Sequence, residues 1–319
     1  MTKPKAAFYW CASCGGCEEA VVDLNEGLLD LAEAVDIVFW PVALDFKVRD
    51  VEALEDGELA VTFLNGGIRT SEQAAMAKLL RRKSGLMVAF GSCSHLGGVP
   101  GLANLTSRDA LLDTVYRQAP TVVNPEGVVP QVLTDLDGKE LVLPEILDTL
   151  KTLDQVVDVD YYVPGCAPPA ELVAQAVTAI LEGKLPPKGS VLAPDTTLCD
   201  TCPRRDSKPA DLALTEIRRI HEVEVDPTRC FLEAGVLCLG MGTRSGCGER
   251  CLNANMPCNG CFGPTSRTED QGAKLLSAVA SLFSGEEESD AERLAAAVAD
   301  PAGTFYRYGL PASLLRRRM

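Results

Sequence analysis

Thirteen cysteines in a chain of 319 residues constrain the fold more than any other feature of this sequence. The chain starts without an apolar stretch followed by small residues, so we expect no secretory signal and a cytoplasmic location. Thiols stay reduced in that compartment, and an odd number of cysteines also fits a disulfide framework poorly. We therefore expect most of these cysteines to bind metal as thiolates.

The rest of the composition is that of a globular protein. Apolar residues make up 46% and charged residues 24%, and the length allows one large domain or two of ordinary size. The net charge of −15 argues against a nucleic-acid or anionic-membrane partner. No apolar run reaches the roughly 18 residues of a membrane span. No GxGxxG or Walker motif occurs, so we do not expect NAD or ATP to bind.

The first half alternates short apolar runs with helical patterns, which predicts an α/β fold with a doubly wound parallel sheet. The expected strands lie at 6–10, 35–40, 59–64, 86–90 and 159–163. The expected helices lie at 18–31, 71–82, 108–116 and 170–181. Residues 127–145 interrupt the alternation, and Asp137 and Gly138 between two apolar runs predict a hairpin there.

The pattern changes after a Pro- and Gly-rich linker at 183–189. Residues 195–267 are rich in Cys, Gly and Pro, and only one helix is predicted there, at about 210–222. Such a segment buries too little apolar surface to fold without metal. An acidic run at 285–290 precedes an expected helix at 291–299. We therefore expect three parts, which are a flavodoxin-like domain at 1–188, a cysteine-rich and mostly irregular domain at 189–284, and a C-terminal helix and tail at 285–319.

Four cysteines of the first half directly follow expected strands and are flanked by glycine or proline. They are Cys14, Cys17, Cys93 and Cys166. Because ligands of an open parallel sheet bind where its loops converge, these four should share one site. Flanking glycines let backbone N–H groups approach an anionic cluster, so we favour a 4Fe–4S cluster over zinc. Cys11 is left out as a free buried thiol, because Val21 stands where a ferredoxin run would continue with cysteine.

The eight cysteines of the second half suffice for two further sites of four. Chain order gives one site from Cys199, Cys202, Cys230 and Cys238, and a second from Cys247, Cys251, Cys258 and Cys261. Spacing alone does not forbid an interleaved arrangement. Two zinc ribbons are the alternative, although the isolated Cys230 and Cys238 break the rhythm of paired cysteines that a ribbon needs.

Nine motifs in this order run through nearly the whole chain. They are CGGCEE (14–19), GSC (91–93), NPEGVVPQ (124–131), PGCAPP (164–169), CDTCPR (199–204), CFLEAGVLCLG (230–240), SGCGERC (245–251), MPCNGCFGP (256–264) and GTFYRYGLPAS (303–313). Together they resemble the small subunit of NiFe hydrogenases. More narrowly, the chain resembles the cytoplasmic methyl-viologen-reducing type that works with heterodisulfide reductase.

The resemblance implies three 4Fe–4S clusters and a NiFe centre on a separate large subunit. The first-half cysteines would hold the proximal cluster, the set from Cys247 to Cys261 the medial one, and the set from Cys199 to Cys238 the distal one. An iron–sulfur acceptor subunit would take the electrons. Periplasmic relatives often have His in place of Cys199 and lack a counterpart of Cys251. The extra thiolates here should lower the cluster potentials.

Three other side chains and two alternative functions complete these expectations. Glu18 is either a solvated residue at a helix start or part of a proton route, and neither His95 nor His221 is expected to bind metal. A zinc-stapled assembly subunit without redox function is one alternative. Another is the same relay in a complex like respiratory NADH dehydrogenase, whose related 20 kDa subunit shares only the first domain.

Overall fold

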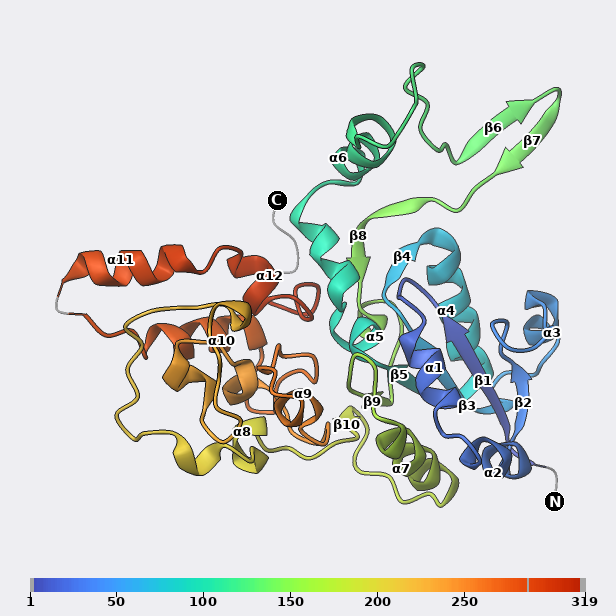
Figure 1. The fold of residues 1–319 in the computed structure, drawn as a ribbon. Coiled ribbons are helices and arrows are strands. Elements are labelled where there is room, and N and C mark those ends of the chain that lie inside the picture. The colour runs from blue at the N-terminus through green and yellow to red at the C-terminus, as the bar shows by residue number, and fades with distance from the viewer. Residues whose placement is uncertain (1–2, 286, 316–319) are drawn as a thin grey trace.

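The computed structural model describes residues 3–285 and 287–315. Its centre is a six-stranded parallel sheet in the order β10-β9-β5-β3-β1-β2 (Figure 1). The strands are β1 (Lys5–Trp10), β2 (Asp36–Phe39), β3 (Leu59–Asn65), β5 (Ser84–Phe90), β9 (Tyr161–Val163) and β10 (Ser190–Val191). Without the short β10, this is the 2-1-3-4-5 order of flavodoxin-like folds. The expected fold class is therefore confirmed.

Helices cover both faces of the sheet, because the strands are apolar on both sides. In β1, Ala6 and Phe8 belong to one core and Ala7 to the other. The first core is closed by α1 (Gly16–Val22), α2 (Gly27–Ala34) and α7 (Ala170–Leu181), and the second by α3 (Val48–Glu52) and α4 (Ser71–Lys83). The predicted helices at 71–82 and 170–181 are thus confirmed.

Two helix predictions were wrong. The expected single helix at 18–31 is broken between α1 and α2, where Asn25 takes a left-handed φ of 54°. An apolar face with a 3.6-residue period continues across this break and conceals it. The expected helix at about 210–222 contains only the 3₁₀ turn η5 (Ile220–Glu222), because its segment extends along the cysteine-rich region and pairs Arg218 with Val236 in an isolated bridge.

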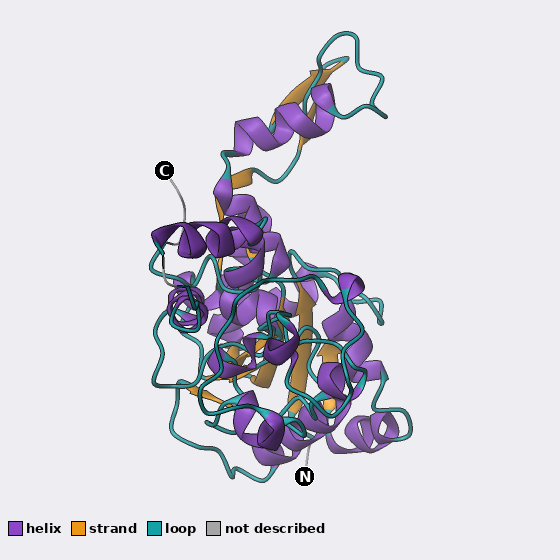
Figure 2. Ribbon diagram, turned by 60° about the vertical axis from the view of Figure 1, so that its left-hand side comes forward, coloured by secondary structure: helices purple, strands orange, loops and turns teal. Residues whose placement is uncertain are grey.

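Residues 106–145 form an arm that projects from the body (Figures 1 and 2). The arm carries α6 (Arg108–Asp113), the π-helical turn η2 (Thr114–Gln118), and the hairpin of β6 (Leu133–Leu136) and β7 (Lys139–Val142). The predicted hairpin is confirmed, with Asp137 and Gly138 at its turn in left-handed conformations. No side chain between residues 105 and 149 is buried. The chain returns through β8 (Ile146–Lys151), which pairs with β4 (Ile68–Thr70).

The cysteine-rich region consists of short helical turns joined by loops. Its elements are α8 (Leu198–Thr201), η4 (Arg205–Ser207), η6 (Phe231–Ala234), η7 (Leu239–Gly242), α9 (Arg250–Asn253) and α10 (Gln271–Ala280). The C-terminal part adds α11 (Glu288–Ala297) and α12 (Pro301–Phe305). Phe262 inserts into the core of the first half, so the two regions share apolar contacts. The sheet strand β10 lies just past residue 188, and the expected domain boundaries stay a prediction.

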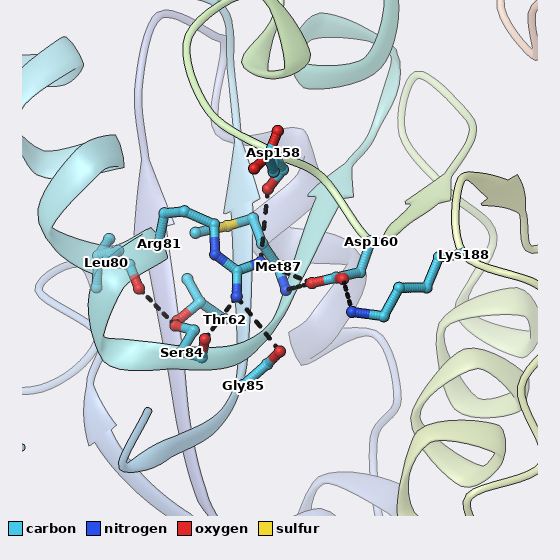
Figure 3. Close-up of polar contacts among 9 residues, drawn as sticks. All are labelled: Thr62, Leu80, Arg81, Ser84, Gly85, Met87, Asp158, Asp160 and Lys188. Atoms are coloured by element: carbon cyan, nitrogen blue, oxygen red, sulfur yellow. Dashed lines mark hydrogen bonds and ion pairs between the residues drawn. The ribbon is translucent and has the colours of Figure 1, made fainter. Parts of the chain in front are cut away.

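Charged groups tie the amino-terminal edge of the sheet together (Figure 3). The buried carboxylate of Asp160 accepts a hydrogen bond from the Met87 N–H at 2.8 Å. It also forms salt bridges with Arg81 at 2.6 Å and Lys188 at 2.5 Å. The cluster joins α4, β5 and the approach to β10. This edge is opposite the carboxyl ends of the strands, where the candidate site lies.

Candidate functional site

The four first-half cysteines meet at the carboxyl edge of the sheet, as predicted. Cys14 and Cys17 lie at the start of α1, Cys93 lies in α5 (Ser92–Leu96), and Cys166 follows β9. Burial raises the pKa of Cys17, and the neighbouring charges of Cys93, Cys166 and Cys14 raise it further. These thiols therefore lie close enough to influence one another.

Glycines leave room for the first-half sulfurs. Gly91 has a φ of 82°, and a Cβ added to it would overlap the Sγ of Cys17. A Cβ at Gly98 would likewise overlap the Sγ of Cys93. The loops are joined by a hydrogen bond from the Gly91 N–H to the Val163 carbonyl at 2.8 Å. The backbone thus forms a tight cradle around these sulfurs that only glycine permits at two positions.

In the second half, Cys199 is influenced by the three other cysteines of the set that chain order gives it. Burial and the charges of Cys238, Cys202 and Cys230 raise the pKa of Cys199 to about 12. No cysteine of the other set acts on Cys199 among the causes of this shift. Cys258 of the other set also lies close to Cys238, so the division of these eight cysteines into two ligand sets stays a prediction.

The other second-half set lies between its neighbours. Burial raises the pKa of Cys261 to about 12, with contributions from Cys247 and Cys251 of its own set. Cys166 of the first-half set acts on Cys261 as well. On its opposite side, the Cys258 N–H donates a hydrogen bond to the Sγ of Cys238 at 3.3 Å. The three cysteine sets therefore form a continuous row across the molecule.

The cysteine sets are loose groups of neighbouring sulfurs. Among residues 3–285 and 287–315, no three His, Cys, Asp or Glu side chains converge closely enough to hold one metal ion. Cys11 lies apart from all three sets, in the core on the α4 face of the sheet. There burial raises its pKa, with a further contribution from the charge of Glu72. The expected burial of Cys11 is confirmed, and its role as a free thiol stays a prediction.

Glu18 is buried beside Cys17, so the solvated alternative was wrong. Its carboxylate accepts hydrogen bonds from the Asn65 side-chain amide at 2.5 Å and from the Trp40 indole. Burial raises the pKa of Glu18, although both hydrogen bonds lower it. Asn65 and Trp40 were not predicted as partners of Glu18. Both stand at carboxyl ends of expected strands, and that position was the available signal.

The two histidines have different surroundings. His95 is half-buried in α5, and its ring lies 4.5 Å from that of Tyr162. Burial lowers the pKa of His95 to about 3, and the charge of Arg244 adds to this effect, so the ring is neutral at pH 7. His221 is exposed in η5. No cysteine is among the groups that influence His95.

Comparison with known proteins identifies the family. The model described as "NADH ubiquinone oxidoreductase, 20 Kd subunit" matches residues 14–180. The iron–sulfur subunit of the F420-non-reducing hydrogenase of Archaeoglobus profundus is 38% identical over 99% of this chain and 98% of its own. The chain belongs to this family of hydrogenase subunits. The corresponding F420-non-reducing hydrogenase subunit of Methanothermobacter thermautotrophicus is 37% identical over 98% of this chain and 96% of its own.

A solved structure supports the same assignment to a hydrogenase. A chain in the "Crystal structure of NAD+-reducing [NiFe]-hydrogenase in the H2-reduced state" is 30% identical, with a TM-score of 0.50. The match covers 58% of this hydrogenase subunit and 94% of that chain. The protein is therefore an electron-transfer subunit of a NiFe hydrogenase, which implies a large-subunit partner. None of its described helices is both long and apolar enough to cross a membrane.

Proposed function

We propose that this chain carries electrons from a NiFe centre on its large-subunit partner through three 4Fe–4S clusters to an iron–sulfur acceptor subunit. The acceptor would be linked to heterodisulfide reductase, and the complex would work in the cytoplasm. The observation that carries this proposal is the continuous row of twelve cysteines in three sets of four. A relay needs such a row because electron carriers must be close neighbours inside the protein.

The ligand sets follow from the order of the row. Cys14, Cys17, Cys93 and Cys166 would hold the proximal cluster. Cys247, Cys251, Cys258 and Cys261 would hold the medial cluster, and Cys199, Cys202, Cys230 and Cys238 the distal one. When bound, each cluster supplies a site that accepts and releases one electron.

The surroundings of the sulfurs suit anionic clusters. Backbone N–H groups donate hydrogen bonds to the Sγ atoms of Cys202 at 3.4 Å, Cys238 at 3.3 Å and Cys258 at 3.4 Å. Hydrogen bonds to sulfur are one means by which a protein sets cluster potentials. The overlap that a Cβ at Gly91 or Gly98 would cause shows that the first-half cradle has no space for larger side chains.

Glu18 is our candidate for a proton carrier on this chain. Its carboxyl is buried, it directly follows a proximal ligand, and two donors hold it in one orientation. Burial raises its pKa above the usual value, so the carboxyl holds a proton more readily than an exposed glutamate does. Replacing Glu18 with Gln should slow dihydrogen oxidation by the complex without changing its iron content.

The arm of residues 106–145 offers a surface for a large partner chain on the side of the proximal cysteines. Both of its ends join elements near the proximal set, since η1 (Val99–Leu105) follows the helix of Cys93 and β8 pairs with β4 next to β3. Exposed apolar side chains such as Val123, Val128 and Val142 lie along the arm. A surface of this kind is typical of an interface.

Metal analysis of the purified complex tests the proposal. We expect about twelve iron atoms and as many sulfides for this chain, in addition to the metal of the partners. A zinc-stapled subunit would instead hold a few zinc ions and no sulfide. Co-purification with a nickel-containing large chain distinguishes a hydrogenase from a complex like NADH dehydrogenase. Zinc without sulfide, or a large chain without nickel, would overturn the proposal.

A further inference from the structure

A buried arginine lies between the distal and medial cysteine sets. Arg204 is only 3% exposed, and its backbone N–H donates to the Sγ of Cys202. Its guanidinium lies 4.1 Å from the ring centre of Phe231, the residue after Cys230. The side chain therefore belongs to the core of the cysteine-rich region, where charged groups are rare unless they are paired.

Every hydrogen-bond acceptor of this guanidinium is neutral. Nη1 donates to the carbonyls of Asp226 at 3.1 Å and Arg229 at 2.9 Å. Nη2 donates to the Leu252 carbonyl at 3.3 Å and to the Asn255 side-chain oxygen at 2.6 Å. Within the described part of the chain, the buried Nε has no partner. Arg204 is thus a solvent-shielded cation without a salt bridge among these residues.

The carboxylate of Asp226, which lies near Arg204, does not compensate the positive charge of the guanidinium. Asp226 is exposed, and its pKa is lowered first by hydrogen bonds from Thr228 and last by the charge of Arg204. A buried cation without a close anion is unfavourable. Two of its acceptor carbonyls belong to residues adjacent to Cys230 and Cys251, which are ligands in the proposed function.

We propose that Arg204 is the fixed countercharge of the distal and medial clusters and raises their midpoint potentials. This inference rests on the proposed function. Four thiolates give each cluster a net negative charge, and reduction adds another. A positive charge held in a medium of low dielectric stabilises the reduced state more than the oxidised one. The fork of hydrogen bonds keeps that charge in one place.

The experiment is a redox titration of the intact hydrogenase complex, followed by electron paramagnetic resonance. In Arg204→Gln, we expect the ratio of reduced to oxidised distal or medial cluster at a fixed potential to fall about tenfold, which corresponds to a shift of about 59 mV for a one-electron couple. Arg204→Lys keeps the charge and should stay closer to the wild type. Arg205→Gln is the matched control, because Arg205 is the next residue, is exposed, and its guanidinium donates to the Asp200 carbonyl at 3.1 Å.

The dependence on salt concentration further distinguishes the effects of the two arginines on the potentials. The effect of Arg204 should persist from about 0.1 M to about 1 M salt, because its charge is shielded from solvent, whereas any effect of Arg205 should vanish. Unchanged potentials in Arg204→Gln with full iron content would overturn the inference. If Arg204→Gln loses iron, the iron content and the cluster potentials of Arg204→Lys decide between a countercharge and a structural role. Restored iron with near wild-type potentials supports the countercharge, and loss of iron in both variants shows a purely structural role. Absence of iron and sulfide from the wild type would instead refute the proposed function.

Discussion

The backbone N–H of Cys258 donates a hydrogen bond to the Sγ of Cys238 at 3.3 Å, so two cysteines from different sets share a border. Cys258 also feels the charge of Cys238 as the largest electrostatic influence on its pKa, which burial raises. In the proposed ligand sets these two cysteines bind different clusters, and the cysteines that influence Cys199 are Cys238, Cys202 and Cys230. The loss of one ligand should therefore affect one cluster and leave the others in place.

Cys238→Ser tests this independence. We expect the variant to lose one cluster, or about four iron atoms per chain, because serine is a poor ligand for iron–sulfur clusters. Cys11→Ser is the control. Cys11 is buried in the core on the α4 face of the sheet, so this variant should keep its iron content. Iron and sulfide determination on both purified complexes measures the difference. Equal iron in the two variants would show that Cys238 is not a ligand.

Gly91→Ala should selectively damage the proximal site. The added Cβ would overlap the Sγ of Cys17, so we expect the proximal cluster and about four iron atoms to be lost. Gly57→Ala is the control, because Gly57 has a similar φ of 81° but nothing lies within 4 Å of its added Cβ. That control should cost about 1 kcal/mol of stability and no iron. Similar iron losses in both variants would point to strain rather than to the cradle.

Glu18→Gln should change how stability depends on pH. Burial raises the pKa of Glu18 above 4.5, despite the hydrogen bonds from Trp40 and Asn65. The folded chain thus holds this proton more tightly than the unfolded one. Its contribution to stability is complete below about pH 4.5 and is lost as the pH rises through the folded-state pKa. Glutamine does not ionise, so the variant should gain stability relative to the wild type over this rise.

Denaturant unfolding across this pH range measures the difference in free energy of unfolding between Glu18→Gln and the wild type. The control is Glu19→Gln, because Glu19 is exposed in the same helix and should behave like the wild type at every pH. A constant difference in free energy of unfolding between Glu18→Gln and the wild type would show that Glu18 has an ordinary pKa.

Local patterns predicted the sheet but not the surroundings of the site. Apolar runs located the main strands, and strand ends located Cys14, Cys17, Cys93 and Cys166, because both signals are local in the sequence. The break near Asn25 was missed, since it depends on a single left-handed residue inside an amphipathic pattern. The two-residue strand β10 was also missed, because its pairing with β9 comes from tertiary contacts.

Side chains that act through distant partners were harder to predict. The acceptors of Arg204 come from segments between residues 226 and 255, so no local pattern marks this arginine as buried. The same reason explains the wrong helix at about 210–222, where a bridge between Arg218 and Val236 overrides local helical preference. The grouping of second-half cysteines by chain order stays a prediction, because Cys258 of one set lies close to Cys238 of the other.

Asp160→Asn should destabilise the fold without affecting the clusters. Burial alone would raise the pKa of Asp160, but hydrogen bonds from Lys188, the Met87 N–H and Arg81 outweigh it and hold the pKa below 3.8. The carboxylate therefore stabilises the fold above about pH 4, and this contribution is lost as the pH falls. We expect the amide to cost about 2 kcal/mol at pH 7, as measured by chemical denaturation.

The control for this prediction is Asp56→Asn. Asp56 is 62% exposed in its contacts with Lys83 and Arg82, so the change should cost much less stability than Asp160→Asn. Iron content should match the wild type in both variants, because Asp160 precedes β9, whereas Cys166 follows its opposite end. Equal costs for the two variants would mean that the cluster in Figure 3 contributes no more than a surface salt bridge.

Charged substitutions on the arm should weaken binding of the large subunit. Leu133 and Val142 are cross-strand neighbours in the hairpin and are 54% and 70% exposed. Next to them on the same face, Asp135 lies opposite Glu140, an unfavourable pair of like charges that a basic partner surface would relieve. Changing Leu133 and Val142 to Asp adds more negative charge and removes apolar contact. We expect at least a tenfold loss of affinity, about 1.4 kcal/mol or more.

The binding measurement uses purified variant chain and the large subunit. Val48→Asp is the control, because Val48 is also exposed but lies in α3, far from the arm (Figure 1). This control should bind like the wild type. Because the arm contributes nothing to the buried core, the double variant should unfold at the same denaturant concentration as the wild type. Normal binding of the large subunit together with loss of self-association would instead assign the arm to contact between two copies of this chain.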